Sequence, residues 1–382
     1  MISGAVTSQI KARKRRTVGA LLLVACFVAG FGIGTVVSQQ STQSTLLFTI
    51  AYSSEKASWM EMIKPYFLDW FAARFPGRTV KIDFFPVGSV ESINAIVSGE
   101  YKPAIWSPAA AMWIPYLNLI WEQQFGTSKP ITTINVSTIY SPIVIATWQS
   151  LLSVHNFTSL QELHDLAALA NSTIKLAHTD PSQSNSGFCA TIMAVAAAAK
   201  KNSSDLIYPD LTNASIKTWM KVFESAAVYY GTSTGYLVQS MLQSGPSGIN
   251  VAFLYENLVT DKSSSAKAQW HDPLVAIYPK EGCIYSDHPF CVLDGAPWMT
   301  PDMLDIAMKF VNDFLHQRNV LEAATSTGFR VHDPSIVLPN ATFNSNKGVH
   351  YNISSVPLLT VPRDANFIAR VADFWLMSRP VI

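Results

Sequence analysis

A polar loop before an alanine-rich segment is the part of the chain best suited to chemistry. The run Ile174 to His178 predicts a strand, residues 179–187 read Thr-Asp-Pro-Ser-Gln-Ser-Asn-Ser-Gly, and a helix is predicted over Ala190 to Lys200. The first N–H groups of a helix lack partners within it and carry the positive end of the dipole, so such a loop can hold an anion or a polar ligand atom. The same residue types are also typical of an N-cap turn, and the loop alone leaves both interpretations open.

Hydroxyl-bearing residues follow other predicted strands in the same way. Strands are predicted over Leu46 to Ala51, Thr79 to Phe85, Ala104 to Trp106 and Ile249 to Leu254. In open α/β sheets ligands bind beyond the carboxyl ends of the strands, next to helix starts. We therefore expect these turns to converge on one small polar solute, held by neutral dipoles. The candidate ligand-binding residues are Ser53, Ser54, Ser89, Ser107, Ser184, Asn185, Ser186 and Tyr255, with Glu256 as a weaker candidate.

The elements that would position these residues alternate between short apolar runs and amphipathic segments, which is typical of an α/β fold. The chain is longer than one hydrophobic core usually serves, so we expect two lobes. Lobe 1 is predicted over residues 46–145 with 280–382 and lobe 2 over 146–279, with Ser141 to Trp148 and Leu274 to Leu293 as extended crossings. Helices are predicted over Trp59–Phe75, Val90–Ser98, Ala109–Trp121, Ser159–Ala170, Trp219–Tyr230, Thr300–Gln317 and Asp364–Met377.

The N-terminus reads as a membrane-targeting segment. Five basic residues between Lys11 and Arg16 precede an uncharged run from Val18 to Val37, which is long enough to span a bilayer as a helix. The basic flank places residues 1–17 in the cytoplasm and the chain after the linker 38–45 outside. A signal anchor is the first interpretation. Cleavage after Ser38, or a lipobox ending at Cys26, remains as an alternative.

Composition excludes some classes of partner. Without the five basic residues at the N-terminus, 22 of the 27 Lys and Arg remain against 26 Asp and Glu, so the exported part is mildly acidic and nucleic acid is not an expected partner. Many Asn-x-Ser/Thr sequons are consistent with a glycosylated outer surface. They begin at Asn135, Asn156, Asn171, Asn202, Asn213, Asn340 and Asn352.

The sequence gives less evidence for cysteine or metal chemistry than for a polar binding site. Cys283 and Cys291 lie eight residues apart between β-like runs in an exported chain, so we expect a disulfide between them, whereas Cys189 reads as a buried helix residue. Asp180-x-Ser182-x-Ser184 matches the first metal-binding motif of a von Willebrand A domain, but no complementary loops follow. Neither zinc-ligand spacing nor a nucleophile elbow or nucleotide loop occurs, and the sequence predicts no cofactor, no metal and no enzymatic activity.

A resemblance to a known family rests on several short motifs in order. The chain resembles an extracellular solute-binding protein of the type II periplasmic-binding superfamily, in the branch that includes molybdate-type binding proteins. The resemblance covers most of the chain from Phe48 to Trp375. Its carriers are Phe85-Pro86-Val87-Gly88-Ser89, Pro103-Ala104-Ile105-Trp106-Ser107-Pro108, Ser141-Pro142-Ile143-Val144-Ile145-Ala146, Thr179-Asp180-Pro181 with Ser184-Asn185-Ser186-Gly187, Phe253-Leu254-Tyr255-Glu256-Asn257, and Ser286-Asp287-His288-Pro289 with Gly328-Phe329-Arg330.

The resemblance implies two α/β lobes joined by a hinge, with a ligand in the cleft between them. It also implies a monomer that delivers a small polar solute, with an oxyanion as the first expectation, to an ABC-type permease in the membrane. Two other classes stay open: a membrane-anchored sensing or adhesive ectodomain with the same fold, and an exported enzyme on the same scaffold. Within the binding class, a binder of sugar or of a metal ion is the alternative to an oxyanion binder.

Overall fold

The computed structural model describes residues 45–380 and contains two sheets. The first sheet has the strand order β2-β1-β3-β11-β4. Its strands are β1 (Leu46–Ser53), β2 (Val80–Val87), β3 (Ile105–Ser107), β4 (Ile134–Val136) and β11 (Phe290–Val292). Because β1 and β3 run parallel with Tyr52 opposite Ser107, the turns after both strands lie at the same edge of the sheet.

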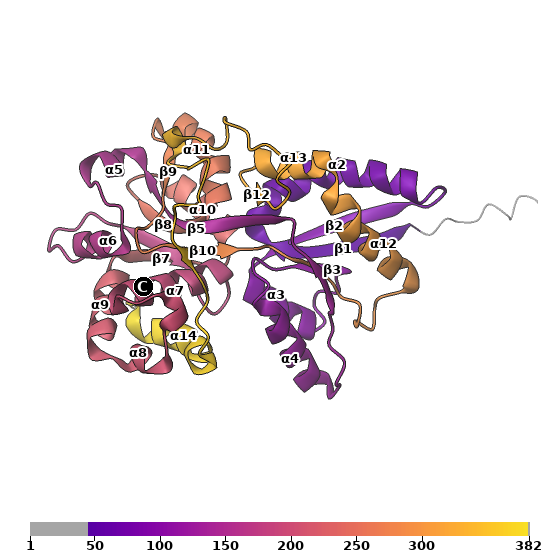
Figure 1. Ribbon diagram of the computed structural model, residues 1–382, viewed down its shortest axis with the longest axis horizontal. Coiled ribbons are helices and arrows are strands. Elements are labelled where there is room, and N and C mark those ends of the chain that lie inside the picture. Colours follow the sequence, from indigo (N-terminus) through magenta and orange to yellow (C-terminus); the bar gives the residue numbers. More distant parts are fainter. Residues whose placement is uncertain (1–44, 381–382) are drawn as a thin grey trace, which may run out of the picture. The chain divides into compact units, whose positions relative to one another are not determined.

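Helices accompany the first sheet (Figure 1). Helix α2 (Ala57–Arg74) contacts β2, and α12 (Pro301–Asn312) contacts β4 and β11. Helix α3 (Ser89–Val97) packs on α4 (Trp113–Phe125), and α13 (Arg318–Ser326) packs on α2. Figure 1 draws α2 and α13 on one side of β1 and β3, and α3 and α4 on the other.

The second sheet has the order β13-β10-β5-β8-β6-β7, and β9 and β12 also pair with β5. The long strand β5 makes antiparallel pairs with β8, β9, β10 and β12, whereas β6 is parallel to both β7 and β8. The strands are β5 (Ile139–Trp148), β6 (Leu176–Thr179), β7 (Ala227–Gly231), β8 (Val251–Tyr255), β9 (Leu274–Ile277), β10 (Cys283–Ser286), β12 (Arg330–Val331) and β13 (Leu358–Leu359).

Helices cover both faces of this second sheet. Helix α7 (Asn185–Ala199) contacts β5, β6 and β8 on one face, while α10 (Thr234–Ser244) and α11 (Glu256–Trp270) contact strands from the other. Helix α7 is almost entirely buried because α6 (Leu160–Ala167), α9 (Ala214–Ser225) and α14 (Ala365–Ser378) contact it. Two short helices, α5 (Gln149–Val154) and α8 (Tyr208–Thr212), complete this part. The predicted α/β class is confirmed.

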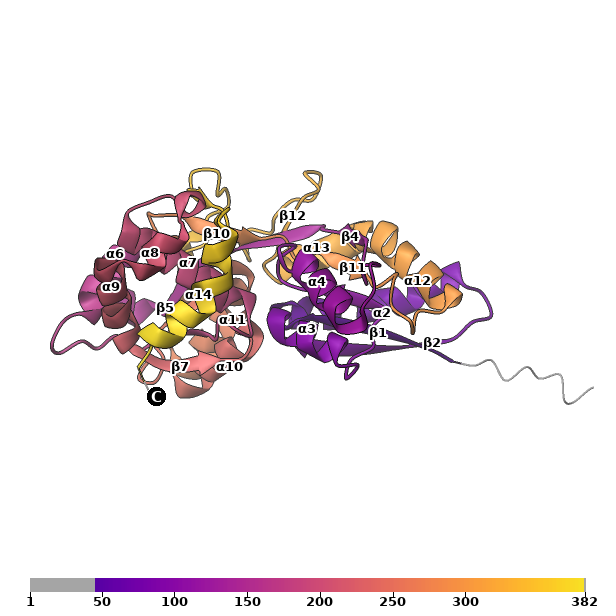
Figure 2. The same ribbon diagram turned by 90° about the horizontal axis from the view of Figure 1, so that it is seen from below.

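The C-terminal helix α14 contacts α7, α8 and α9, and Figure 2 shows it beside α7. These partners lie within residues 146–279, which the sequence assigned to lobe 2, whereas α14 itself was assigned to lobe 1. The lobe boundaries stay a prediction, and these contacts favour placing α14 with lobe 2.

The predicted disulfide between Cys283 and Cys291 is wrong, because both cysteines are buried and free. Cys283 lies on β10, which pairs with β13 and β5, while Cys291 lies on β11 opposite Trp106 and Asn135 of the first sheet. The residues between them carry the chain from one sheet to the other and do not form a hairpin. The two thiols are therefore held in different sheets.

The helix predicted over Trp219 to Tyr230 is too long. Helix α9 ends at Ser225, and residues 227–231 form the edge strand β7 beside β6. Val228, Tyr229 and Tyr230 are β-branched or aromatic and suit a half-exposed strand, which explains the change of element.

The predicted membrane segment, residues 18–37, lies outside the described residues. Within residues 45–380, no helix combines the length and apolar character needed to cross a bilayer. All seven sequon asparagines lie in this part of the chain, and each is exposed.

Candidate functional site

The turn after β1 places a buried ion pair at the edge of the first sheet. A 3₁₀ turn, Ser54–Lys56, leads directly into α2, so Glu55 and Lys56 are turned inward and almost fully buried. The ammonium of Lys56 donates to the carbonyl oxygens of Ser107 at 3.0 Å and Pro108 at 3.1 Å, and to the hydroxyl of Ser53. Lys56 thus ties the ends of β1 and β3 together and uses all three of its donors.

Burial and charge act on the two partners of this pair. Burial alone would raise the pKa of the Glu55 carboxyl, but Lys56 and a contact with His288 outweigh burial and lower that pKa to about 2. Burial lowers the pKa of Lys56 to about 8, and the nearby Glu55 carboxylate limits the fall. The carboxylate is therefore charged over the whole neutral range, and the ammonium is largely charged at pH 7.

His288 lies beside this pair on the segment between β10 and β11. Its Nδ1 is 3.2 Å from Oε1 of Glu55, without the alignment of a hydrogen bond, and neither ring nitrogen has a hydrogen-bond partner among the described residues. Burial, together with Lys56, lowers the pKa of His288, so the ring is neutral. The Ser107 hydroxyl is likewise buried without a partner in this region. Oδ1 of Asn257, whose amide nitrogen donates to the Glu55 carbonyl oxygen at 3.1 Å, is also buried without a partner. Buried polar groups are normally hydrogen bonded, so all these atoms are able to bind a further partner.

Asn185 connects the predicted loop to this cluster. It is the first residue of α7; its amide donates to the Tyr255 hydroxyl at 2.9 Å and to the Ser286 hydroxyl at 3.0 Å, and its oxygen accepts from the Trp113 indole at 2.8 Å. The ring of Tyr255 packs edge-on against His288, with centroids 5.2 Å apart. Asn185, Tyr255 and the turns after β1 and β3 are therefore brought together.

Ser54 faces a different segment and lines a small cavity. Its hydroxyl donates to the hydroxyl of Ser233 at 2.7 Å and accepts the backbone N–H of Gly235 at 2.9 Å. The cavity beside it has a volume of about 120 Å³. Its lining residues are Ser54, Glu55, Ala57, Ser58, Pro86, Gly235, Tyr236, Val238, Gln239, Leu258 and Lys262.

Two helices begin at this cavity. Ala57 and Ser58 are the first residues of α2, and Gly235 is the second residue of α10. No side chain at the N-cap position of either helix accepts a hydrogen bond from its first turn. The N-terminal dipole ends of α2 and α10 thus face the same small space.

Of the other predicted site residues, Ser89, Ser186 and Glu256 have side-chain partners within the fold. The Ser89 hydroxyl accepts the N–H of Ala109 at 3.0 Å, and the Ser186 hydroxyl contacts those of Thr179 and Thr234 at 2.8 and 2.7 Å. Ser184 is the N-cap residue of α7 and makes no side-chain cap bond. Glu256 forms a buried ion pair with Arg330, with Oε1 2.8 Å from Nε, and also accepts the Tyr278 hydroxyl. The fold thus turns Glu256 toward Arg330.

Other signals in the sequence have local structural roles. The Asp180 carboxylate accepts the N–H and the hydroxyl of Ser182 at 2.7 and 2.6 Å, which is a turn closed by a side chain. The Tyr230 hydroxyl donates to Glu224 at 2.7 Å. In residues 45–380, His, Cys, Asp and Glu nowhere gather in a group of three suited to a metal ion.

Sequence reasoning missed Glu55, Lys56, His288, Gly235 and Lys262. A signal was present for the first two, because they are the first charged residues after the linker in a chain with only 14% charged residues, and they directly follow a buried strand. Gly235 and Lys262 come from α10 and α11, helices that were not predicted. No local pattern distinguishes them from ordinary helix residues.

The buried carboxylate predicts a specific sensitivity to acid. Because the pKa of Glu55 is lowered from 4.5 to about 2, the unfolded chain binds more protons between these values, and stability is lost as the pH falls through them. The loss from this group is roughly 3 kcal/mol, at about 1.4 kcal/mol per pKa unit. Urea unfolding at pH 5, 4, 3 and 2 checks this. Glu55→Gln should make the free energy of unfolding depend less on pH in this range. Glu100→Gln, at an exposed position, should leave the pH dependence unchanged. Equal slopes for Glu55→Gln and the parent would contradict the assignment.

Comparison with known proteins agrees with this geometry. The family model described as "Bacterial extracellular solute-binding protein" matches residues 49–330. None of the curated protein sequences matches the chain.

Solved structures share the fold at low sequence identity. A periplasmic thiamin binding protein has a TM-score of 0.61 at 11% identity, covering 89% of this chain and 98% of its own. The periplasmic binding protein AfuA from Actinobacillus pleuropneumoniae, with fructose-6-phosphate bound, has a TM-score of 0.58 at 14% identity, covering 86% and 98%. A ferric binding protein from Campylobacter jejuni has a TM-score of 0.53 at 12% identity, covering 87% and 96%.

These likenesses establish the two-lobed α/β fold of periplasmic binding proteins and leave the solute unspecified, since the ligands named for the three proteins differ. The family match covers most of the chain and includes the turns after β1, β3, β6 and β8. The chain therefore belongs to the family of bacterial extracellular solute-binding proteins.

Proposed function

We propose that the protein captures a small oxyanion in the cavity beside Ser54 and Gly235 and delivers it to an ABC-type permease. In this proposal residues 18–37 anchor a monomer in the membrane, with the rest of the chain outside. A molybdate-type solute is the first candidate. The observation that carries the proposal is the meeting of two helix N-termini, those of α2 and α10, at one small cavity.

The size of the cavity favours a solute of few atoms. Its volume of about 120 Å³ is well below the roughly 300–1,000 Å³ of sites for drug-sized ligands. The solutes named for the similar structures include thiamin and fructose-6-phosphate, which are larger. A tetrahedral oxyanion suits the space better than either.

The charges around the cavity cancel in pairs. Glu55 is neutralised by Lys56, at 3.6 Å, and Lys262 lies 2.7 Å from Asp261. Attraction for an anion must then come from the helix dipoles and from N–H and hydroxyl donors, which agrees with the expectation of neutral dipoles. Lys262 remains the one lining residue with a positive charge, and Ser58 accepts a hydrogen bond from it at 3.3 Å.

Residues from both predicted lobes line the cavity. Ser54 and Pro86 belong to the predicted lobe 1, while Gly235 and Lys262 belong to lobe 2. The hydrogen bonds of Ser54 to Ser233 and Gly235 join these parts directly. In the proposed mechanism a hinge motion opens this contact for solute entry and closes it again.

Calorimetric titration of the full chain tests the proposal. We expect binding of molybdate, tungstate, sulfate or phosphate, and a thermal shift that rises with the logarithm of ligand excess. Lys262→Met should weaken binding about tenfold or more, or about 1.4 kcal/mol. It removes the cation that neutralises the Asp261 carboxylate beside the cavity, and only the hydrogen bond from the Ser58 hydroxyl to that carboxylate remains. Lys267→Met, at an exposed position of the same helix, is the matched control. Tight binding of a sugar, a polyamine or ferric iron, with no response to any oxyanion, would overturn the proposal.

A further inference from the structure

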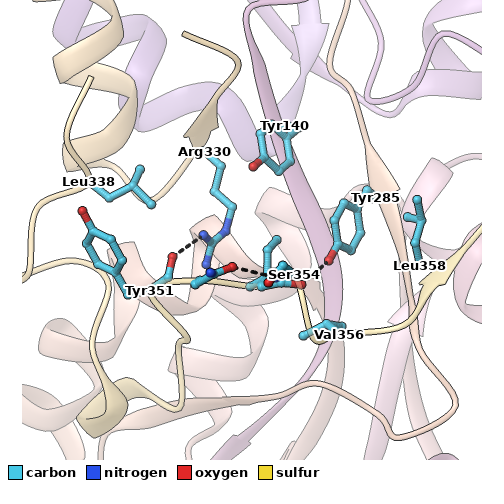
Figure 3. Close-up of a pocket in the computed structure, with 10 residues that line it drawn as sticks. Tyr140, Tyr285, Arg330, Leu338, Tyr351, Ser354, Val356 and Leu358 are labelled. Carbon is cyan, nitrogen blue, oxygen red and sulfur yellow. Dashed lines mark hydrogen bonds between the residues drawn. The ribbon is translucent and has the colours of Figure 1, made fainter. Parts of the chain in front are cut away.

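A second, larger pocket lies where β5, β10 and β12 meet the segment 351–358 (Figure 3). Its volume is about 590 Å³, within the usual range for a ring-sized ligand. It shares no lining residue with the cavity beside Ser54. The lining residues are Tyr140, Tyr285, Arg330, Leu338, Tyr351, Asn352, Ile353, Ser354, Val356 and Leu358.

Aromatic rings form much of the wall. Tyr140 on β5 and Tyr285 on β10 are nearly parallel, with centroids 6.2 Å apart and an interplanar angle of 15°, and His332 stacks on Tyr140 at 5.0 Å. Figure 3 draws these two tyrosines on one side of the pocket and Tyr351 with Leu338 on the other. Tyr351 is 48% exposed. Flat aromatic faces with polar edges are surfaces on which the C–H faces of a sugar ring can pack.

The pocket offers no uncompensated charge. The guanidinium of Arg330 binds Glu256 through Nε and Nη2, at 2.8 and 3.1 Å, and donates to the carbonyl oxygens of Tyr351 and His350. Its charge is therefore cancelled and its donors are largely used. The Tyr285 hydroxyl donates to the carbonyl oxygen of Ile353 at 3.4 Å. Among the described residues the phenol oxygens of Tyr140 and Tyr351 have no hydrogen-bond partner, so these two neutral hydroxyls remain free. These features fit an uncharged, polar ring and disfavour an anion.

One sequon opens onto this pocket. Asn352, Ile353 and Ser354 form an Asn-x-Ser sequence, and all three line the pocket. The side-chain amide oxygen Oδ1 of Asn352 accepts the backbone N–H of Ser354 at 2.8 Å, which fixes the side chain in a turn, and the asparagine is exposed. A sugar linked to its amide nitrogen would start at the rim of the aromatic wall.

We propose that this pocket is a saccharide subsite that seats a hexose or N-acetylhexosamine ring, supplied by a glycan on Asn352. A free saccharide would present the same ring chemistry. The two sources differ in whether the sugar is covalently linked to Asn352. This proposal is independent of the solute bound beside Ser54.

The first arm of the test uses the full chain made in a host whose secretory pathway glycosylates sequons. Mass spectrometry should find a glycan at Asn352. Asn352→Gln also removes the side-chain contact with the Ser354 N–H, so it should lower Tm by about 2 °C more in the glycosylated protein than in the unglycosylated protein. Tyr140→Ala should abolish this glycan-dependent difference, and Tyr140→Phe should keep it. Asn171→Gln, at an exposed sequon, is the matched control. Tyr351→Ala replaces Tyr140→Ala if that variant does not fold.

The second arm titrates unglycosylated protein with free N-acetylglucosamine and follows saturation-transfer NMR. If the first arm finds no glycan at Asn352, and free N-acetylglucosamine gives a saturation-transfer signal that Tyr140→Ala removes, the subsite is supported and its ligand is a free saccharide. A Tyr140-dependent stabilisation by the attached glycan would assign it to Asn352. No glycan-dependent stabilisation together with no free-sugar signal would overturn the proposal.

Discussion

Replacing Lys56 by Met should lower the free energy of unfolding by about 3–5 kcal/mol, because it leaves the buried Glu55 carboxylate without its cation. The side chain of Lys56 is fully buried, and its three donors join Ser53 with the carbonyl oxygens of Ser107 and Pro108. Methionine fills a similar volume, so lost charge and hydrogen bonds, and not a cavity, account for the effect. Urea denaturation at pH 7 gives the measurement.

Two further variants separate charge from packing in this prediction. Glu55→Gln combined with Lys56→Met should recover part of the loss, since no buried charge then remains unpaired. Lys309→Met removes the surface ion pair with Asp305, at 2.7 Å, and should cost less than about 1 kcal/mol. If Lys56→Met costs no more than Lys309→Met, the ion pair does not hold the two strand ends together.

Gly235→Ala should reduce solute affinity on the order of 10- to 100-fold, or about 1.4–2.8 kcal/mol, while the protein stays folded. A Cβ at this position would lie 2.6 Å from the carbonyl oxygen and 2.8 Å from the carbonyl carbon of Ser54. Backbone atoms cannot move aside as a side-chain end can, so α10 would be pushed away from Ser54 and the cavity would widen. Alanine also favours the helix itself by about 0.5–1 kcal/mol over glycine.

Titration with the oxyanion that gives the largest thermal shift measures this effect, and circular dichroism reports on the fold. Gln243→Ala changes an exposed residue of the same helix and should leave affinity unchanged. Parent-like binding by Gly235→Ala would show that the solute site does not need the contact between α10 and Ser54.

Much of the fold follows from local patterns in the sequence. The apolar runs at Leu46 and Ile249 become β1 and β8, and the polar loop after His178 does lead into the buried helix α7. These elements could be predicted because the burial of a strand or helix produces a recognisable spacing of apolar residues in the sequence. Helices α10 and α11 were missed because the helical spacing of their apolar residues is weak. Helix α11 carries a run of polar residues around Ser263, and its apolar positions face β5 and β9 only in the assembled fold.

The meeting of some turns was predicted, and the role of their residues in ligand binding stays a prediction. Hydroxyl-rich turns do meet, as the contacts of Asn185 with Tyr255 and of Ser54 with Ser233 show. The buried pair of Glu55 and Lys56 was not foreseen, because its stabilisation depends on carbonyl oxygens more than 50 residues away in sequence. The disulfide prediction failed for the same reason. The strands that pair with β10 and β11 decide where the thiols of Cys283 and Cys291 lie, and the spacing of the two cysteines in the sequence does not.

The place where an oxyanion binds can be located in a crystal of the chain soaked with tungstate, because tungsten scatters X-rays anomalously and an anomalous difference map marks its position. We expect an anomalous peak in the cavity lined by Ser54, Gly235 and Lys262, with the tungstate oxygens directed at the first turns of α2 and α10. A peak at another location, or an empty cavity at a tungstate concentration that saturates binding in solution, would contradict it.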